Sequence, residues 1–530
     1  MEIDLSQPDV DLETASKRLR SQVCIVGGGI AGLILAQGLV ASGHTVTILE
    51  AGGRDRALAD PLPDPFEAEL RGQPHAGTRE SRVRALGGSS VTWGGQLLSL
   101  PNDTEWPLPL DEIRHRELNW KLPYNTSAFF AMQRTDPPAL LGHLPGLTPR
   151  LSRFVPFSRR NLAELIGKKL VANKKVNVVL HASVTEVVMA PGQDHILGVT
   201  VRTPSGHEFQ VQADQFVLAA GTVETCRLLL ASRSVTPEGV GNGFGQVGLH
   251  FHDHLTLSAV EFTGDARRRM LAELRPWIFS ERHRRQALFS MKLEPSAPLR
   301  AQLGIHAAMA HLTIEEPEGS GVGTLRGLLQ ARQGKTPNTS WVDQARALPE
   351  LATNAWRLAR EARKEHRRYV SPQARVFLQV NIAQDTPSTS RVLLSEERDR
   401  FGMPKAIVDW CISAAELASF RRFAVYLRTQ LATAGIDQGA VWAPALFREG
   451  MDGDRELLSL IDDARHAMGG ARMGTDPRTS VVDPDLRVHG LQNLSLASTA
   501  VFPDGSAQLP TVTLSALALR LAERLDTQLG

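Results

Sequence analysis

Cysteine is scarce in this chain of 530 residues, which contains only Cys24, Cys226 and Cys411. The three positions lie far apart in the sequence and form no CxxC pair. This number and spacing argue against a disulfide framework and against a cysteine-ligated metal or redox site. We therefore expect the protein to work in a reducing compartment.

An excess of charge of one sign and a long apolar run are also missing. The 59 basic and 57 acidic residues leave a net charge of +2, so electrostatics provide no basis for binding nucleic acid or an anionic membrane surface. The longest apolar stretches, such as Val23–Val26, are far shorter than the roughly 20 residues of a membrane span. Met1–Arg20 lacks the apolar core of a signal peptide. We expect a soluble, cytoplasmic protein.

Residues 21–50 have the pattern of a strand, a glycine turn, a helix and a second strand. Val23–Val26 is a short apolar strand, and Val46–Leu49 is a run rich in β-branched residues. Between them, Ile30–Ser42 has helical spacing, and Gly43 ends it. Such a βαβ unit predicts a parallel sheet and an α/β fold.

A second group of strands is predicted between residues 174 and 220. Proline and glycine turns separate short runs rich in β-branched residues. The last run is almost wholly apolar and leads through Gly221 into a helix from Val223, which is typical of a nucleotide-binding fold. The runs are Val176–Leu180, Val184–Met189, Leu197–Arg202, Glu208–Val211 and Gln215–Ala220.

The turn at 27–32 matches the GxGxxG pattern of dinucleotide-binding folds. Gly27 allows the tight turn, Gly29 lets backbone N–H groups approach a pyrophosphate, and Gly32 lets the helix pack closely on the strand. The N-terminus of that helix adds partial positive charge for the phosphates. Glu50, at the end of the second strand, is placed to bond a ribose hydroxyl. An acid there disfavours a 2′-phosphate, so FAD or NAD fits and NADP does not.

The segment Leu86–Gly95, with the sequence LGGSSVTWGG, is a second candidate for cofactor contact. Its four glycines and two serines around one tryptophan make a poor core strand and a poor helix. They suit a loop that lets a flat ring lie close to the backbone, although an ordinary glycine-rich turn has the same composition.

The remaining segments differ in how much they indicate. Towards the C-terminus we predict strands at Val481–Pro484 and Leu494–Leu496, a loop at Ala500–Asp504 and an amphipathic helix at Thr511–Leu525. The pattern of residues 260–375 gives little indication of secondary structure or function. These residues contain arginine-rich clusters, for which solvated helix faces are the simpler explanation and a basic docking surface the alternative. These clusters are Arg267–Arg269, Glu281–Arg285 and Arg357–Arg368.

Taken with GGGIAG and Glu50, the RALGGSSVTWGG loop resembles the glucose–methanol–choline (GMC) oxidoreductases, above all the bacterial branch that oxidises sugars and sugar-like alcohols. Further similar segments follow in order, and only residues 260–375 are poorly covered. They are Trp106–Leu110, His181–Thr185, VLAAGTVETCRLLLAS from Val217, Ser390–Trp410 and the C-terminal block from His466.

The resemblance implies two interleaved domains. A Rossmann-type FAD-binding domain would contain residues 1–98, 150–250 and 461–530. An α+β substrate-binding domain of sheet and helices would contain residues 99–149 and 251–460. The active site should lie where the two meet, over the flavin ring.

Hydride removal from an alcohol carbon needs a group that accepts the hydroxyl proton, and histidine suits this because its pKa lies near working pH. His466, in the sequence HAMGG, matches the family's catalytic H-x-x-G histidine. His252, His254 and His489 are expected to be structural, with His254 near enough to touch the site.

The glycine turn, the glycine-rich loop and the resemblance together imply a set of FAD contacts. The start of the helix at Thr511 would add partial positive charge at the end of the flavin that becomes negative on reduction. The expected contacts are Gly27, Gly29, Ile30, Ala31, Gly32, Glu50, Ala51, Gly87, Gly88, Ser89, Ser90, Thr92, Trp93, Gly94, Gly95, Val184, Ala220, Gly221, Ala500, Leu509, Pro510 and Thr511.

Two positions depart from the family. Leu509 stands where the family has a second histidine or an asparagine, and leucine can neither donate nor accept a hydrogen bond. Gln508 is adjacent but should face the other way in an extended segment unless a bulge turns it in, so it is only a weak second catalytic candidate. Thr92 stands where pyranose-type sugar oxidases bond the flavin through a histidine, so we expect non-covalent FAD.

The expected function is oxidation of an alcohol, with His466 taking the hydroxyl proton and flavin N5 taking the hydride. The expected substrate is a sugar, amino sugar, glycoside or similar metabolite, and oxygen or a soluble electron acceptor would reoxidise the flavin. Two alternatives remain because of Leu509. One is a flavin-dependent desaturase or other tailoring enzyme of secondary metabolism, and the other is a lyase in which FAD is structural.

Overall fold

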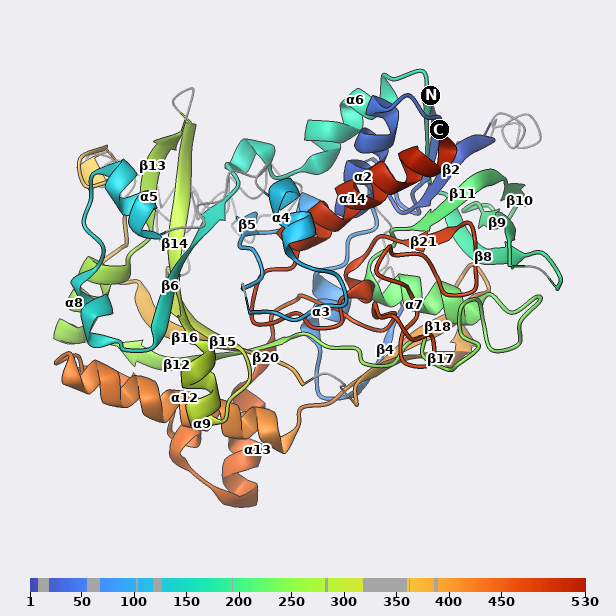
Figure 1. Ribbon diagram of the computed structural model, residues 1–530. Coiled ribbons are helices and arrows are strands. Elements are labelled where there is room, and N and C mark those ends of the chain that lie inside the picture. Colours follow the sequence, from blue (N-terminus) through green and yellow to red (C-terminus); the bar gives the residue numbers. More distant parts are fainter. Residues whose placement is uncertain are drawn as a thin grey trace, which may run out of the picture.

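A computed structural model of the protein describes residues 1–7, 19–54, 67–101, 103–117, 126–192, 194–281, 285–317, 360–361, 363–385 and 389–530. These residues form two large sheets and two small ones, with helices on their faces (Figure 1). The expected mixed α/β architecture is confirmed. No helix in the described ranges is long and apolar enough to cross a membrane.

The first large sheet has six parallel strands in the order β1-β7-β3-β2-β11-β21. All four residues of β3 are buried, and five of the six in β2 are, as expected for parallel strands covered on both faces. The strands are β1 (Glu2–Asp4), β2 (Ser21–Val26), β3 (Val46–Leu49), β7 (Val176–Leu180), β11 (Ala213–Leu218) and β21 (Leu494–Leu496).

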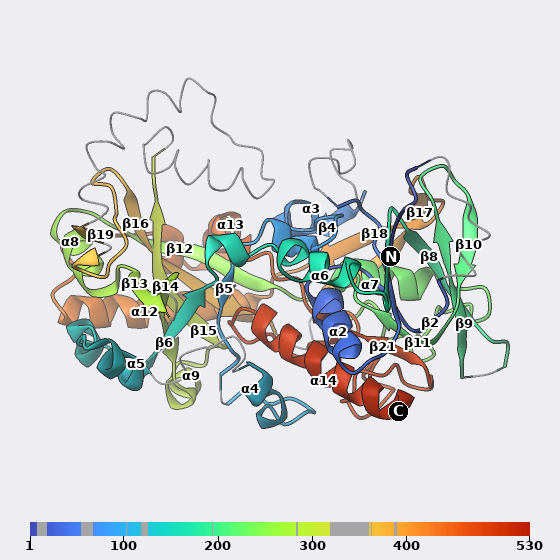
Figure 2. The same ribbon diagram turned by 90° about the horizontal axis from the view of Figure 1, so that it is seen from above.

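Two helices from opposite ends of the chain lie side by side next to this sheet in both views (Figures 1 and 2). They are α2 (Ile30–Ala41), which packs on β2 and β3, and α14 (Thr511–Leu529), which packs along α2. Leu33, Leu35 and Leu39 of α2 are completely buried. The C-terminal helix thereby becomes part of the layer that begins with the glycine turn.

The second large sheet has nine antiparallel strands and lies on the left of Figure 1. The path β19-β12-β16-β15-β14-β6-β5 forms its body, and β13 and β20 pair with β14 and β12. The strands are β5 (Gln96–Leu97), β6 (Leu147–Phe154), β12 (His254–Phe262), β13 (Trp277–Glu281), β14 (Arg285–Pro295), β15 (Ala308–Glu315), β16 (Arg375–Ala383), β19 (Ala440–Trp442) and β20 (Asp462–Asp463).

Helices cover the second sheet and link it to the first. The longest is α12, which starts at a capping box between Ser413 and Glu416 and packs on β16. Buried apolar side chains form one continuous cluster that spans both large sheets. Apart from α2 and α14, the α-helices of the described residues are α3 (Ala76–Glu80), α4 (Asp111–Glu117), α5 (Thr126–Gln133), α6 (Lys168–Val171), α7 (Thr222–Ala231), α8 (Gly264–Leu274), α9 (Ala297–Leu303), α12 (Ala414–Thr433) and α13 (Gly450–Leu460).

Two three-stranded sheets lie outside the large ones. The first has the order β10-β9-β8 and is antiparallel. The second joins β17 and β18 to β4. Their strands are β8 (Ser183–Met189), β9 (Ile196–Arg202), β10 (Glu208–Val211), β4 (Glu69–Gly72), β17 (Arg391–Arg398) and β18 (Pro404–Trp410).

Most of the expected elements are confirmed, and one is wrong. Residues 481–484 form no strand, because only Val482 makes isolated bridges, to Met473 and Val488. The division into domains stays a proposal. β6 crosses its boundary at residue 150, since the whole strand belongs to the nine-stranded sheet.

The arginine-rich clusters are only partly described. Residues 282–284, 357–359 and 362 of these clusters lie outside the described residues. Arg367 donates to the carbonyls of Arg275 and Ala272 and lies over the ring of Trp277. Arg267 donates to the carbonyls of Ser371 and Ala374. Arg269 in turn donates to carbonyls at 434 and 435. Arg267 and Arg269 therefore tie α8 to its neighbours, while Arg268 and Arg269 stay exposed, as a solvated helix face predicts.

Candidate active site

The glycine turn between β2 and α2 is determined by close backbone contacts. Gly27 has φ +106°, and a Cβ there would lie 2.5 Å from Ala219 O. A Cβ on Gly32 would lie 2.1 Å from Gly27 O, so only glycine lets the helix approach the turn. A Cβ on Gly29 would meet no atom within 4 Å. The side of the turn at Gly29 is therefore open to a ligand.

Glu50 closes the end of β3 beside this turn and is buried. Its two carboxylate oxygens accept the backbone N–H groups of Gly28 and Gly52, each at 2.8 Å. Burial raises the pKa of Glu50, and these two hydrogen bonds oppose that shift. The carboxylate is held rigidly and has lone pairs left for a ligand hydroxyl.

One cavity of about 870 Å³ brings the expected cofactor residues together. It runs from the glycine turn and Glu50, past the glycine-rich loop, to His466. Its volume lies near the upper end for ligand sites, which suits a large dinucleotide. All of the expected cofactor residues line it except Gly32, Gly87, Ser90 and Ala500.

The glycine-rich loop is folded against its surroundings in a way that fits a flat ligand. Gly88–Val91 forms a 3-10 turn, and Ser90 Oγ donates to Gly87 O and accepts from Leu162 N. The indole of Trp93 donates to Arg160 O at 2.9 Å. A Cβ on Gly94 would meet nothing within 4 Å, so the loop leaves open space on the cavity side. Together with the open position at Gly29, this fits FAD.

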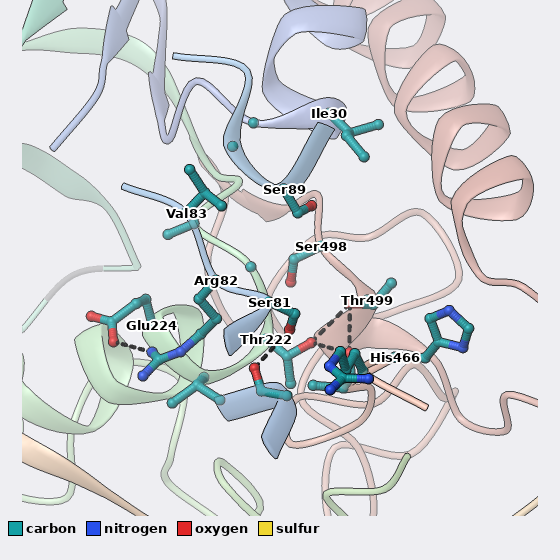
Figure 3. A pocket seen from close by; sticks show the side chains of 18 of the residues that line it. Ile30, Ser81, Arg82, Val83, Ser89, Thr222, Glu224, His466, Ser498 and Thr499 are labelled. Carbon is teal, nitrogen blue, oxygen red and sulfur yellow. Dashed lines mark hydrogen bonds and ion pairs between the residues drawn. The ribbon is translucent and has the colours of Figure 1, made fainter. Parts of the chain in front are cut away.

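A partly buried ion-pair network, which was not predicted from the sequence, borders the cavity, and Figure 3 shows its pair of Arg82 and Glu224. Glu224 on α7 pairs with Arg82 at 2.8 Å and with Arg227 at 3.1 Å. Arg227 also pairs with Asp399 at 2.6 Å. Burial opposes ionisation of Glu224, but Arg227 and Arg82 lower its pKa overall. The position of Arg82 just before the loop motif was the only sequence signal.

His466 occupies the far end of the cavity, and Asp253 holds its backbone in place. The backbone N–H of His466 donates to both oxygens of Asp253, at 3.0 and 2.8 Å. Asp253 is fully buried, and His75 Nε2 lies 3.2 Å from its Oδ2. Burial acts to raise the pKa of Asp253, but the hydrogen bond and charge of His75 lower it. Asp253 therefore stays ionised and fixes the position of His466.

His254 determines which nitrogen of His466 carries the proton. The Nδ1 atoms of the two rings lie 3.1 Å apart, and His254 Nε2 lies 3.2 Å from Gly505 O. A carbonyl only accepts, so His254 Nε2 must donate, and its Nδ1 then accepts from His466 Nδ1. The remaining His466 nitrogen, Nε2, keeps its lone pair. The sequence predicts a structural His254 near the site, and in the structure its ring contacts His466 directly.

Both rings are held neutral. Burial and the nearby His466 lower the pKa of His254 to about 3. Burial also lowers the pKa of His466, although Asp253 and Asp463 act in the opposite direction. A neutral His466 is ready to accept a proton at neutral pH.

The other candidate residues lie outside this arrangement. The Gln508 side chain is turned away from the cavity, where its amide donates to buried Glu294, so the weak second catalytic assignment is wrong. Its neighbour Leu509 lines the cavity instead. His252 and His489 contact His250 O and Ser480 Oγ, each at 2.9 Å.

Two groups of side chains have a spacing that could hold a metal ion, and both include Asp253. One contains His254 and His466, and the other His75 and Asp463. The hydrogen bonds and ion pairs described above account for these contacts without a metal.

Models of the GMC oxidoreductase family match the chain in two places. The N-terminal model matches residues 163–256, and the C-terminal model matches residues 386–518, which include His466.

Individual relatives agree. The fructose dehydrogenase large subunit of Gluconobacter japonicus is 22% identical over 96% of this chain and 98% of its own length. The 6'''-hydroxyparomomycin C oxidase of Streptomyces lividus is 24% identical over 62% of this chain and 47% of its own length. The solved structure of pyridoxine 4-oxidase from Mesorbium loti has the same fold, with a TM-score of 0.58 at 18% identity over 95% of this chain and 98% of that one. The chain belongs to the GMC oxidoreductases, a family of FAD-dependent enzymes.

Proposed function

We propose that the protein oxidises an alcohol to a carbonyl compound, with His466 as the base and with FAD bound non-covalently. One observation carries this proposal: neutral His466, with Nδ1 held by His254, lines the same cavity as the glycine turn and Glu50. Bound FAD supplies the acceptor for the hydride. The chain itself supplies the proton acceptor and the geometry.

The steps assigned to the chain follow from the contacts of His466. Its Nε2 accepts a hydrogen bond from the substrate hydroxyl and takes the proton as the carbon–hydrogen bond breaks. The resulting positive charge is stabilised by buried Asp253 below the ring. The start of α14 at Thr511 lines the cavity, and its partial positive charge favours a reduced cofactor.

Sugars and sugar-like alcohols are the proposed substrates. The relatives above are named for fructose and for an amino-sugar compound, which supports a polyhydroxylated substrate. Polar side chains on the wall opposite the glycine turn support the same class, since sugar hydroxyls need hydrogen-bonding partners.

An anaerobic titration of the purified holoenzyme tests the proposal. Sugars, sugar acids, amino sugars, glycosides and simple alcohols are added in turn while the flavin absorbance band is followed. Bleaching by one class supports alcohol oxidation and identifies the class. Substrate turnover without bleaching would contradict it and favour the lyase alternative, in which FAD is structural.

The mode of FAD attachment is tested separately. Position 92 is a threonine, so there is no histidine at this position to form a covalent bond to the flavin. We therefore expect acid precipitation to release all of the yellow colour into the supernatant. Colour that stays with the precipitated protein would show a covalent bond.

The rate of flavin reduction should depend on pH through His466. Burial lowers its pKa below the usual 6.5, so the base is free at neutral pH and becomes protonated as the pH falls through that lowered value. We expect a flat rate above pH 6.5 and a decline on the acid side. Stopped-flow reduction across this range measures it. A rate that rises as the pH falls would contradict the base assignment.

His254→Phe should slow flavin reduction about 10- to 100-fold, because the ring that orients the base is lost. Protonated His466 is an imidazolium, which donates from both nitrogens. Loss of His254 removes the acceptor for Nδ1 and so disfavours the protonated form. The decline in rate on the acid side should therefore shift to lower pH. His489→Phe is the matched control and should leave both quantities unchanged. A slower rate with an unmoved acid limb would indicate a merely structural role for His254.

A further inference from the structure

The cavity wall opposite the glycine turn is built by four neighbouring strands of the nine-stranded sheet. We call the cavity-facing side chains Thr256, Lys292, His311, Gln379 and Asn381 the polar wall. Strand register brings them together: His311 on β15 lies opposite Gln379 on β16, and Asn381 on β16 lies opposite Thr256 on β12. Lys292 comes from β14, on the other side of β15. These residues are far apart in sequence but form one surface.

Two members of the polar wall satisfy each other. The Gln379 amide donates to Thr256 Oγ1, and its oxygen accepts from Thr313 Oγ1 at 2.6 Å. These side chains are already in place and need no ligand.

The other three members lack partners within the described chain. Lys292 is 1% exposed, and its ammonium makes no hydrogen bond or ion pair with any described residue. His311 Nδ1 and Asn381 Oδ1 are buried without a hydrogen-bond partner. An unpaired buried charge is costly, and each unpaired buried polar atom adds to that cost. A ligand that pairs with all three would remove this cost.

The carboxylates that line the cavity are in the opposite situation, because each of them already has a partner. Glu80, Glu224 and Asp399 are paired with arginines, and Glu50 and Asp463 accept backbone N–H groups. The pairings are Glu50 with Gly28 N, Glu80 with Arg465, Glu224 with Arg82, Asp399 with Arg227, and Asp463 with Gly77 N.

We propose that Lys292, His311 and Asn381 form a subsite for a carboxylate of the substrate, so that the enzyme oxidises a hydroxylated acid such as a sugar acid. This inference rests on the proposed function and names its substrate class. The Lys292 ammonium and a His311 N–H donate to the carboxylate, while Asn381 Oδ1 accepts from a neighbouring hydroxyl. A neutral sugar would leave the ammonium unpaired, and an amino sugar would be repelled by it.

The charges around Lys292 agree with one shared site. Burial lowers the pKa of Lys292 to about 7, and Glu294 on the same strand opposes this shift. His311 on β15 and His466 on the catalytic loop both have their pKa lowered, first by burial and also by the charge of Lys292. Glu294, His311 and His466 are thus the titratable groups that face Lys292. The carboxylate subsite and the base therefore lie within electrostatic reach of each other.

The test compares matched acids and neutral compounds on the holoenzyme. D-glucuronate is compared with D-glucuronamide, D-glucose and D-glucosamine, and D-gluconate with D-glucitol. Binding is measured by the shift of the flavin absorbance band, and reduction by anaerobic bleaching. Lys292→Met keeps most of the side-chain volume without the charge, and exposed Lys174→Met is its matched control.

Each acid should bind more tightly than its neutral counterpart. This should hold both for the wild-type enzyme and for Lys174→Met. Lys292→Met should weaken binding of the acids about 30-fold and leave the neutral compounds unchanged. Binding of the acids should also weaken in the wild type above pH 7, as Lys292 loses its proton. Acids that fail to bind, or that bind as well to Lys292→Met, would overturn the subsite.

The two proposals fail in different ways. If acids bind selectively but no compound bleaches the flavin, the subsite stands and alcohol oxidation fails. If neutral sugars bleach the flavin while acids neither bind nor react, alcohol oxidation stands and the carboxylate subsite fails.

Discussion

Replacing His466 with alanine should lower the rate of flavin reduction about a thousandfold while FAD stays bound. The residue lines the cavity, its Nδ1 is engaged by His254, and its backbone is held by Asp253. These contacts leave Nε2 as the free acceptor for a substrate proton. Removing the ring removes that acceptor, whereas the glycine turn and Glu50 at the other end of the cavity are untouched.

The measurement is stopped-flow reduction of the anaerobic holoenzyme at saturating substrate, with the flavin content read from the same spectra. His489→Ala is the matched control, because its ring contacts Ser480 and does not line the cavity. A His466→Ala variant that reduces its flavin as fast as wild type would show that the base is another group.

Substitution by alanine should affect protein stability differently at two glycines of the same turn. A Cβ at Gly32 would lie 2.1 Å from Gly27 O and 3.3 Å from Ile25 Cγ2, so backbone and a buried side chain leave little room to relax. Gly32→Ala should lower the free energy of unfolding by about 3 kcal/mol and abolish FAD binding. At Gly29, φ is −78° and a Cβ would meet nothing within 4 Å. Gly29→Ala should therefore change apoprotein stability by less than about 1 kcal/mol.

Gly29→Ala should nevertheless weaken FAD binding, because its methyl group would project into the space that a pyrophosphate needs. Denaturant unfolding of the apoproteins measures stability, and titration with FAD measures affinity. Comparison of Gly32→Ala with Gly29→Ala separates the packing role of the turn from its role in FAD binding. Wild-type FAD affinity in Gly29→Ala would show that the cofactor does not approach this part of the turn.

The expectations from sequence were most accurate where structure is local. The unit of β2, glycine turn, α2 and β3 was predicted almost to the residue, because apolar periodicity and glycine positions act over a few neighbours. The helix α14 was recognised in the same way. The strand predicted at Val481–Pro484 was wrong. An apolar, β-branched run forms a strand only if a neighbouring strand has a free edge with which it can pair. Here Val482 makes isolated bridges only.

The environment of the base depended on long-range contacts. His466 was identified from its motif, yet its orienting partner His254 lies 212 residues earlier in the chain. Nothing in the local pattern around His254 distinguishes it from His252, whose ring hydrogen-bonds the carbonyl of His250. Leu509 lines the cavity and Gln508 does not, as expected, but Gln508 stands at a bend and not in an extended segment, and its amide is held outside by Glu294.

By itself, the sequence predicted the family, the dinucleotide turn and the candidate base, because each is written in a short run of residues whose spacing is set by backbone geometry. Only the tertiary structure decided which side chains share the cavity with that base. Lys292, His311 and Asn381 come from three separate strands and meet through sheet register. Register depends on the pairing of the whole sheet, so no local segment encodes which side chains meet there.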